Sequence, residues 1–420
     1  MVTYSPLNGT TASSKTNRTR LWLLFGGLVV IAFLSWPSSP SLPHLSDLPP
    51  SFTNRFTSSA TSPPTLRVDD STGSVPVADS IIPSDKWWQD ISVVYTWVNG
   101  SETSFLEDKQ ALTGQDPGAN RFRDDGLFRY SVRSVEKYLP WHKGEIILLS
   151  RRNHLPDWID ASNPRFRHVA VEDIMPSEVF PNFDSNAIEA YMHLIPGLTN
   201  RFLYLNDDFF IGRPTSPELF FTPTGGVKLY REWDDVRDRV GTDDWTISVK
   251  ATGQLIEDEY GTLPDKVIRV PAHAPYALLR NALRNLHAHP RFGPAIRESV
   301  AHRVRWSGDI NIHILHAAYA MFDKAVPSDL AAEFDDEHRA QFVAWTNNAE
   351  KNEQSWEDLK DVDPPFFNIN DEMAVDADDA LKDLWARLEL MYPKPSWLEK
   401  SKDVTVVVEE KKLEVRRWRD

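Results

Sequence analysis

The chain contains no cysteine in its 420 residues. Disulfide bonds, thiolate nucleophiles, iron–sulfur clusters and zinc sites with cysteine ligands are therefore all excluded. Basic residues are outnumbered, because the chain has 46 Lys and Arg but 61 Asp and Glu, which gives a formal net charge of −15. Generic binding to nucleic acid requires a basic surface, so we expect no nucleic-acid partner.

Only one long hydrophobic run stands out, Leu21–Trp36, which carries no charge. A full membrane span needs about 20 residues, with a lower limit near 17, so a cleaved signal peptide is the alternative interpretation. The long polar leader and the Trp36-Pro37 exit favour an uncleaved single-pass anchor. Basic residues precede the run and none follows it closely, which predicts residues 1–20 in the cytosol and the rest in the lumen. Early secretory membranes are thin and suit short anchors, so we expect a type II protein of the Golgi membrane.

The rest of the chain divides by composition. Residues 37–85 are rich in Ser, Thr and Pro and have too few apolar groups to offset the entropy cost of ordering, which predicts a disordered stalk. Residues 86–400 have the composition of a globular domain, which we expect to be the lumenal catalytic domain. Residues 401–420 form a charged tail.

Within residues 86–400, short apolar runs alternate with segments of helical periodicity. This alternation predicts an α/β layered fold. The expected strands are Ile91–Trp97, Glu145–Ser150, Arg167–Val171 and Arg201–Leu205, and the expected helices are Arg129–Tyr138 and Ser185–Ile195. Ligands of such sheets bind at the carboxyl ends of the strands, where Trp97–Gly100 and Asn206–Asp208 would lie.

Asn206, Asp207 and Asp208 are the strongest local signal for chemistry. Two carboxylates and an amide at the end of a buried strand are costly to bury without a cation. Hard oxygen ligands suit Mg²⁺ or Mn²⁺, and such a metal would bridge the phosphates of a nucleotide-sugar. The alternative is a solvated turn or helix cap.

His273 lies in the segment Val-Pro-Ala-His-Ala-Pro-Tyr, where two prolines restrict the backbone. Imidazole suits general-base work near neutral pH, although a structural histidine is the alternative. The polar segments His302–Asp309 and Asn370–Glu372 predict only loops when each is taken alone. His313 and His316 lie one helical turn apart and are more typical of core or surface histidines than of a metal site.

Taken together, these segments resemble the Stealth family. Its members include the alpha/beta precursor of lysosomal-enzyme N-acetylglucosamine-1-phosphotransferase, bacterial capsule polymerases and fungal xylosylphosphotransferases. Four blocks follow the family's order: Val93–Glu102, Arg123–Gly212, Ala272–Tyr276 with His302–Asp309, and Asn368–Glu372.

The resemblance implies a glycosyltransferase-A-like core with a Rossmann-type mixed sheet and flanking helices. The implied reaction moves sugar 1-phosphate from a UDP-sugar donor to a hydroxyl of a glycan or oligosaccharide acceptor and releases UMP. It also implies residue roles, with Asp208 and Asp371 as ligands of Mg²⁺ or Mn²⁺. His273 is the implied base, and Asp207 and Arg303 are further catalytic residues. The implied substrate-binding residues are Trp97, Asn99, Gly100, Arg129, Asn206 and Asn370.

Two features depart from the family pattern. Asp125 stands where many members have Asn. The short segment Arg213–Pro271 replaces the long recognition modules of the animal enzymes, which favours a simple glycan acceptor. Two alternatives stay open, a metal-dependent glycosyltransferase that releases UDP and a non-catalytic glycan-binding protein. The sequence leaves the sugar, the acceptor and the oligomeric state open.

Overall fold

The computed structural model describes residues 86–114, 123–233, 236, 241–264, 268–335 and 339–400. All described residues belong to a single compact unit of the chain. The expected anchor, the stalk and the charged tail lie outside the described residues. Among the residues that are described, no helix has both the length and the apolar character needed to cross a membrane.

A five-stranded sheet confirms the expected α/β architecture, with strand order β3-β2-β1-β4-β8. The first four strands run parallel, and β8 runs antiparallel to β4, so the sheet is mixed. Its strands are β1 (Ser92–Thr96), β2 (Ile146–Ser150), β3 (Phe166–Ala170), β4 (Arg201–Asn206) and β8 (Tyr276–Leu279). The four strands expected from apolar runs are all present, and no strand end differs from its expected position by more than one residue.

A second sheet of three strands has the order β10-β11-β5. It contains β5 (Phe209–Ile211), β10 (Ala340–Trp345) and β11 (Phe366–Asp371). Strand β11 runs parallel to β10 and antiparallel to β5. Because β5 follows β4 after a two-residue turn, the turn that carries Asp207 and Asp208 joins the two sheets.

The third sheet, of order β7-β6-β9, leads into the segment that contains His273. Its strands are β6 (Lys228–Trp233), β7 (Val270–Pro271) and β9 (Glu333–Asp335). Only four residues, 272–275, separate the end of β7 at Pro271 from the start of β8 at Tyr276. His273 is therefore fixed from both sides by strands of two different sheets.

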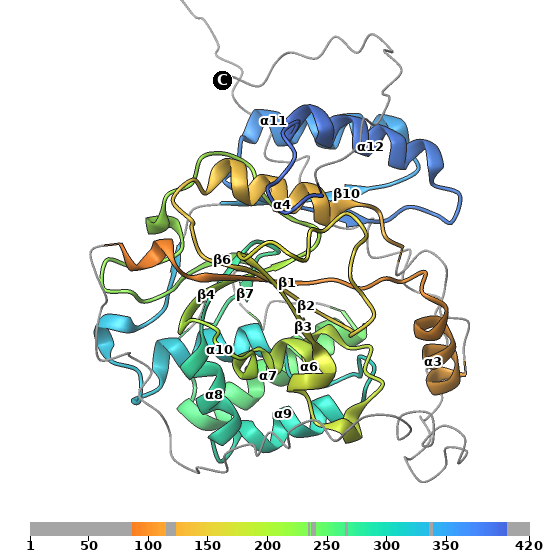
Figure 1. The fold of residues 1–420 in the computed structure, drawn as a ribbon. Coiled ribbons are helices and arrows are strands. Elements are labelled where there is room, and N and C mark those ends of the chain that lie inside the picture. Colours follow the sequence, from red (N-terminus) through yellow and green to blue (C-terminus); the bar gives the residue numbers. More distant parts are fainter. Residues whose placement is uncertain are drawn as a thin grey trace, which may run out of the picture. The chain divides into compact units, whose positions relative to one another are not determined.

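Helices cover both sides of the central sheet (Figure 1). On one side lie α4 (Leu127–Tyr138), α11 (Ala349–Val362) and α12 (Asp378–Met391), together with β10. On the other side lie α6 (Ser185–Ala190), α7 (Asp244–Tyr260), α8 (Arg280–Ala288), α9 (Phe292–Ala301) and α10 (Ile312–Phe322). The remaining α-helices of the described residues are α3 (Thr103–Thr113) and the single turn α5 (Val171–Ile174).

Helix α6 is shorter than the sequence pattern predicts. The Asp184 side chain caps its start, as expected, but the helix ends at Ala190 and a 3₁₀ turn, Met192–Leu194, follows. Pro196 disfavours helical backbone at the residue before it, so a helix cannot readily continue through Ile195. The correction matters because it leaves Glu189 in the last turn of α6, where its side chain points into the core.

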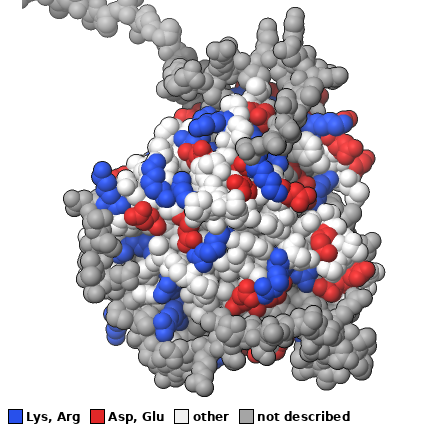
Figure 2. All heavy atoms as spheres, in the orientation of Figure 1, with Lys and Arg blue, Asp and Glu red and all other residues white. Residues whose placement is uncertain are grey.

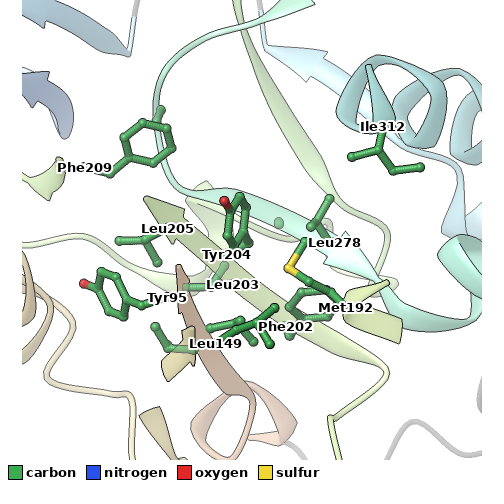
Figure 3. Packing of buried hydrophobic residues seen from close by; sticks show 14 of the residues in the cluster. Tyr95, Leu149, Met192, Phe202, Leu203, Tyr204, Leu205, Phe209, Leu278 and Ile312 are labelled. Atoms are coloured by element: carbon green, nitrogen blue, oxygen red, sulfur yellow. The ribbon is translucent and has the colours of Figure 1, made fainter. Parts of the chain in front are cut away.

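The core consists of apolar side chains from the central sheet and the helices on its two faces. Figure 3 shows Phe202, Leu203 and Leu205 of β4 packed with Tyr95 of β1 and Leu149 of β2. All five are at most 1% exposed. Close packing of this kind leaves little freedom to the strand ends, so side chains placed there have defined positions.

Candidate active site

Asp207 and Asp208 occupy the turn between β4 and β5, and both are half-buried. Burial raises the pKa of Asp207 well above its usual range, and the carboxylates of Asp208 and Asp125 raise it further. Burial also raises the pKa of Asp208, while His273 and Asn368 act in the opposite direction. The turn therefore gathers more negative charge than its protein neighbours neutralise.

Asp125, just before α4, belongs to the same cluster of acidic groups. Its carboxylate accepts a hydrogen bond of 3.1 Å from the backbone N–H of Leu127. Burial raises the pKa of Asp125 to about 8, and the carboxylates of Asp371, Asp124 and Asp208 add to the effect. Asp125 thus interacts electrostatically with acidic groups of both the β4–β5 turn and the end of β11. The sequence analysis noted this residue only as a departure from the family pattern.

Asn368 is the residue of β11 that contacts the turn, and the sequence analysis did not select it. It is fully buried, and its amide donates a long hydrogen bond of 3.5 Å to Asp208 Oδ2. The Oδ1 atom of Asn368 has no hydrogen-bond partner among the described residues. The backbone N–H of Ile369 also donates to the carbonyl of Asp208 at 3.1 Å, which fixes the turn against β11.

Asp371 takes a different partner. Strand alternation places its side chain on the opposite face of β11 from Asn368. There Arg123 Nε lies 3.1 Å from Asp371 Oδ2, and the backbone N–H of Met373 donates to Oδ1 at 2.9 Å. Asp208 and Asp371, the two implied metal ligands, therefore have separate partners, and the carboxylates of both raise the pKa of Asp125. The role of Asp371 as a metal ligand stays a prediction.

Asn370 lies on the same face of β11 as Asn368, two residues closer to the strand end. Its amide donates to Glu372 Oε1 at 3.4 Å near the surface. Its implied contact with substrate stays a prediction, and its half-buried position at the strand end leaves it accessible.

The structure brings His273 to the β4–β5 turn. The ring lies edge-on between Phe209 and Phe342, with centroid distances of 6.0 Å to each. Its charge acts on the neighbouring Asp208 carboxylate and favours the ionised form. His273 is half-buried, so it can reach both the acidic turn and solvent. Its role as a base stays a prediction.

A buried hydrogen-bond network holds the side chain of Asn206 in position. The Tyr204 hydroxyl lies 2.5 Å from Asn206 Oδ1, 2.8 Å from Thr96 Oγ1 and 2.8 Å from Glu189 Oε1. Glu189 Oε2 lies 2.9 Å from His313 Nε2. The interpretation of His313 as a core histidine is confirmed. No local sequence pattern marks this network, because its members come from four separate segments of the chain.

The loop that follows β1 carries the implied donor-side residues Trp97, Asn99 and Gly100. Trp97 is largely buried, with its ring 6.3 Å from those of Phe128 and His154. The backbone N–H of Asn99 donates to His154 Nδ1 at 3.1 Å. The loop is thus anchored by His154, which follows β2.

The two implied phosphate-binding arginines differ in their surroundings. Arg303 is 6% exposed and adopts a left-handed backbone conformation, with φ of 63°. It donates to the Phe180 carbonyl at 3.3 Å, and the described residues provide no carboxylate partner for it. Arg129, in contrast, lies 3.8 Å from Glu399 and over the Trp158 ring. Arg303 is therefore the better candidate for an incoming anion, and its strained backbone is typical of functional positions.

The donor set suits a hard cation. Asp208 offers a carboxylate, and the unpartnered Oδ1 of Asn368 offers an amide oxygen beside it. The described part of the chain contains no group of three or more His, Asp or Glu side chains arranged to hold a metal ion. Mg²⁺ commonly takes only one or two protein carboxylates and completes its shell with water and substrate phosphates. The residues thus fit a cation that is held jointly with a phosphate-bearing ligand.

The surface around this unit shows no large field of one sign on the face drawn in Figure 2. Lys and Arg side chains alternate there with Asp and Glu side chains.

Three family models match the chain. They are described as Stealth protein conserved region 1, conserved region 2 and conserved region 3, and they match residues 89–116, 121–229 and 272–322. These ranges contain the first three blocks that the sequence analysis selected. The fourth block, Asn368–Glu372, stays a prediction.

Curated relatives carry phosphotransferase names. A capsular polysaccharide phosphotransferase of Actinobacillus pleuropneumoniae is 31% identical over 267 residues, which cover 59% of this chain and 69% of the relative. An exopolysaccharide phosphotransferase of Streptomyces coelicolor is 32% identical over 250 residues, which cover 57% of this chain and 40% of the relative. This chain thus spans less than half the length of the Streptomyces protein.

Among solved structures, the galactosyltransferase LgtC with donor and acceptor sugar analogues covers 73% of this chain and 98% of its own. Its sequence identity is 10% and its TM-score is 0.35, which is too low to assign a fold class.

Proposed function

Because the chain belongs to the Stealth family, we propose that it transfers sugar 1-phosphate from a UDP-sugar to a hydroxyl group of a glycan. The acceptor oxygen attacks the phosphorus atom that carries the sugar. A new P–O bond forms to the acceptor, and the P–O bond to the bridging diphosphate oxygen breaks. UMP leaves with the bonding electrons, and the acceptor proton passes to a base. The product is a phosphodiester.

The position of His273 is the observation that carries this proposal. A general base must reach the proton of the attacking group. His273 stands beside the Asp208 turn and between buried Phe209 and exposed Phe342. We therefore assign the acceptor proton to His273, with the transferred phosphoryl group on the side of Asp208.

The acidic turn has the chemistry to hold a cation at the donor phosphates. Asp208 and Asn368 would bind Mg²⁺ or Mn²⁺, and such a cation would neutralise the charge that develops on the leaving UMP. Asp207 would keep the local field negative enough to retain the cation. Asp371 would contribute less to cation binding, because Arg123 already partners it.

The proposal also assigns a role to each of the remaining implied residues. Arg303 would pair with a donor phosphate. Trp97, Asn99 and Gly100 would line the nucleotide side, while Asn206 and Asn370 would contact the sugar or phosphate. Arg129 is the weakest of the implied contacts, because Glu399 and Trp158 already occupy its guanidinium.

We also propose that the protein works in the Golgi lumen as a type II membrane protein. The support is the uncharged run Leu21–Trp36 with basic residues before it, both of which lie outside the described residues. Microscopy of a C-terminally tagged full chain, combined with protease protection of isolated Golgi vesicles, tests this placement. A tag that is digested in intact vesicles contradicts it.

The leaving group tests the proposed reaction. The full chain, purified in detergent, is incubated with Mn²⁺, a panel of UDP-sugars and mannose oligomers, and the nucleotide product is identified by mass spectrometry. UMP supports sugar-phosphate transfer, UDP supports the plain glycosyltransferase, and neither product supports a glycan-binding protein.

Matched variants sharpen that measurement. Asp208→Ala should reduce turnover by about a thousandfold or more, since it removes a charged group from the phosphoryl site. His273→Ala should reduce turnover by about a hundredfold or more, with a smaller effect on donor affinity. Asp379→Ala, on the fully exposed face of α12, serves as the control and should keep the wild-type rate. Full activity of either site variant contradicts the assignment of that residue.

A further inference from the structure

Phe342 stands in an unusual position for a large aromatic side chain. It is 43% exposed, although β10 otherwise buries its bulky residues Val343 and Trp345. Ala340 and Ala344, the two residues that share its face of the strand, are small. The phenyl ring is therefore left open to solvent. Isolated exposed apolar residues are common, so exposure alone would carry no conclusion.

The sheet register ties Phe342 to the candidate site. Phe342 pairs with Asn368 of β11, and Asn368 pairs with Phe209 of β5. Paired residues of neighbouring strands project to the same face, so these three side chains form one row. His273 lies edge-on to the first and last members of that row, at 6.0 Å from each.

The row has a buried end and an open end. Phe209 is completely buried and lies beside the core residues of the central sheet (Figure 3). Asn368 contacts Asp208. Phe342 is the only member of the row that is exposed. A group that approaches His273 from solvent on this side must therefore pass beside the Phe342 ring.

We propose that Phe342 is an acceptor-binding residue that stacks against a pyranose ring of the glycan. This inference rests on the proposed function, because His273 as the base must contact the attacking hydroxyl. One face of a pyranose carries several C–H groups, and these pack favourably on the negative face of an aromatic ring. The sugar next to the attacking hydroxyl would rest on Phe342 while His273 removes the proton.

The proposal separates acceptor recognition from donor recognition. The donor groups gather at the acidic turn and at the loop after β1. Phe342, on the edge strand of a different sheet, would contribute to acceptor binding. Loss of its ring should therefore raise the KM for acceptor far more than the KM for UDP-sugar.

The test compares the full chain with Phe342→Ala, Phe342→Trp and Leu390→Ala. Leu390 on α12 is 55% exposed and serves as the matched control for loss of an exposed apolar side chain. We expect Phe342→Ala to raise the acceptor KM by about tenfold, since a factor of ten corresponds to the loss of one modest contact. Phe342→Trp should keep the acceptor KM within about threefold, and Leu390→Ala should match the wild type.

A direct binding measurement keeps this test independent of the proposed reaction. Mannopentaose, maltopentaose and chitopentaose are titrated into each protein by calorimetry without donor. Weaker binding by Phe342→Ala than by Leu390→Ala supports the proposal even if the wild type releases no UMP, an outcome that would contradict only the proposed function. Equal acceptor KM or equal binding in the two variants overturns the inference, as does a wild type that binds none of the three oligosaccharides.

Discussion

The side-chain amide of Asn368 donates to the carboxylate of Asp208 at 3.5 Å, while the other polar atom of that amide, Oδ1, has no hydrogen-bond partner among the described residues. An unsatisfied buried acceptor carries a desolvation cost of about 1–3 kcal/mol. A cation beside Asp208 would satisfy this oxygen and offset part of the repulsion within the acidic turn. The pair would thus help a site with few carboxylate ligands to retain the metal ion that the proposed function requires.

Asn368→Ala should therefore weaken Mn²⁺ binding. We expect a loss of about tenfold or more in affinity, the range seen when groups that support a metal site are removed. The measurement is a calorimetric titration of Mn²⁺ into the full chain in the presence of UDP. Circular dichroism and thermal unfolding establish that the variant folds.

Gln354→Ala is the matched control, because it also removes a side-chain amide, but one that is exposed on α11 and contacts Asp358 instead. Its Mn²⁺ affinity should stay within about threefold of the wild type, since it lies outside the proposed ligand pair. Equal Mn²⁺ affinities of the wild type and Asn368→Ala would remove Asn368 from the metal site.

The ion pair between Arg123 and Asp371 leads to a second prediction. Arg123 also donates to the carbonyls of Met373 and Ala374, so it ties the segment before α4 to the end of β11. Arg123→Gln and Asp371→Asn should each lower the free energy of unfolding by about 1–3 kcal/mol, because both partners are largely shielded from solvent. Urea denaturation of the two single variants and the double variant measures their coupling.

A coupling free energy of about 1 kcal/mol or more indicates a structural role for Asp371. In that case Asp371→Asn should reduce Mn²⁺ affinity less than Asp208→Asn does. The opposite pattern, loss of Mn²⁺ binding with no loss of stability, would restore Asp371 as a metal ligand and show that Arg123 releases it when the cation binds.

The β4–β5 turn and strand β11 show what the sequence could and could not predict. Apolar runs located four strands of the central sheet, because strands buried on both faces need continuous hydrophobic sequence. The same runs placed Asp207 and Asp208 at a strand end. From the block Asn368–Glu372, the sequence analysis selected Asn370 and Asp371 as site residues but not Asn368. Strand alternation assigns residues to faces only when the pairing partners are known. The register with β5 and β10 settles which residues face the turn.

Long-range packing accounts for the other omissions. Glu189, Tyr204 and His313 form one buried network, yet each belongs to a different segment and lies among ordinary helix or strand residues. Phe342 lies between two blocks of the family pattern and was not selected at all. Such residues acquire a role only through the fold, so composition and spacing along the chain contain no signal for them.

Buried histidines far from the acidic turn predict how stability depends on pH. His142 is 6% exposed, and its Nε2 atom lies 2.9 Å from the Ile91 carbonyl. Burial lowers the pKa of His142 to about 4, Arg165 and Lys143 lower it further, and Ile91 and Asp90 oppose the shift. Burial likewise lowers the pKa of His287 to about 4. Both groups are neutral in the folded protein at neutral pH.

The direction of the effect follows from proton binding. Between pH 4 and about 6.5, the usual value for histidine, the unfolded chain binds a proton that folded His142 does not. The free energy of unfolding therefore rises with pH in this window. The stabilisation that comes from neutral His142 is fully present above about pH 6.5 and is lost as the pH falls toward 4. His142→Gln can keep a hydrogen bond to Ile91 but cannot titrate. Its unfolding free energy should therefore depend on pH less steeply, by up to about 1.4 kcal/mol per pH unit, than that of the wild type. Urea denaturation at four or five pH values measures both slopes, and equal slopes would show that folding does not lower the pKa of His142.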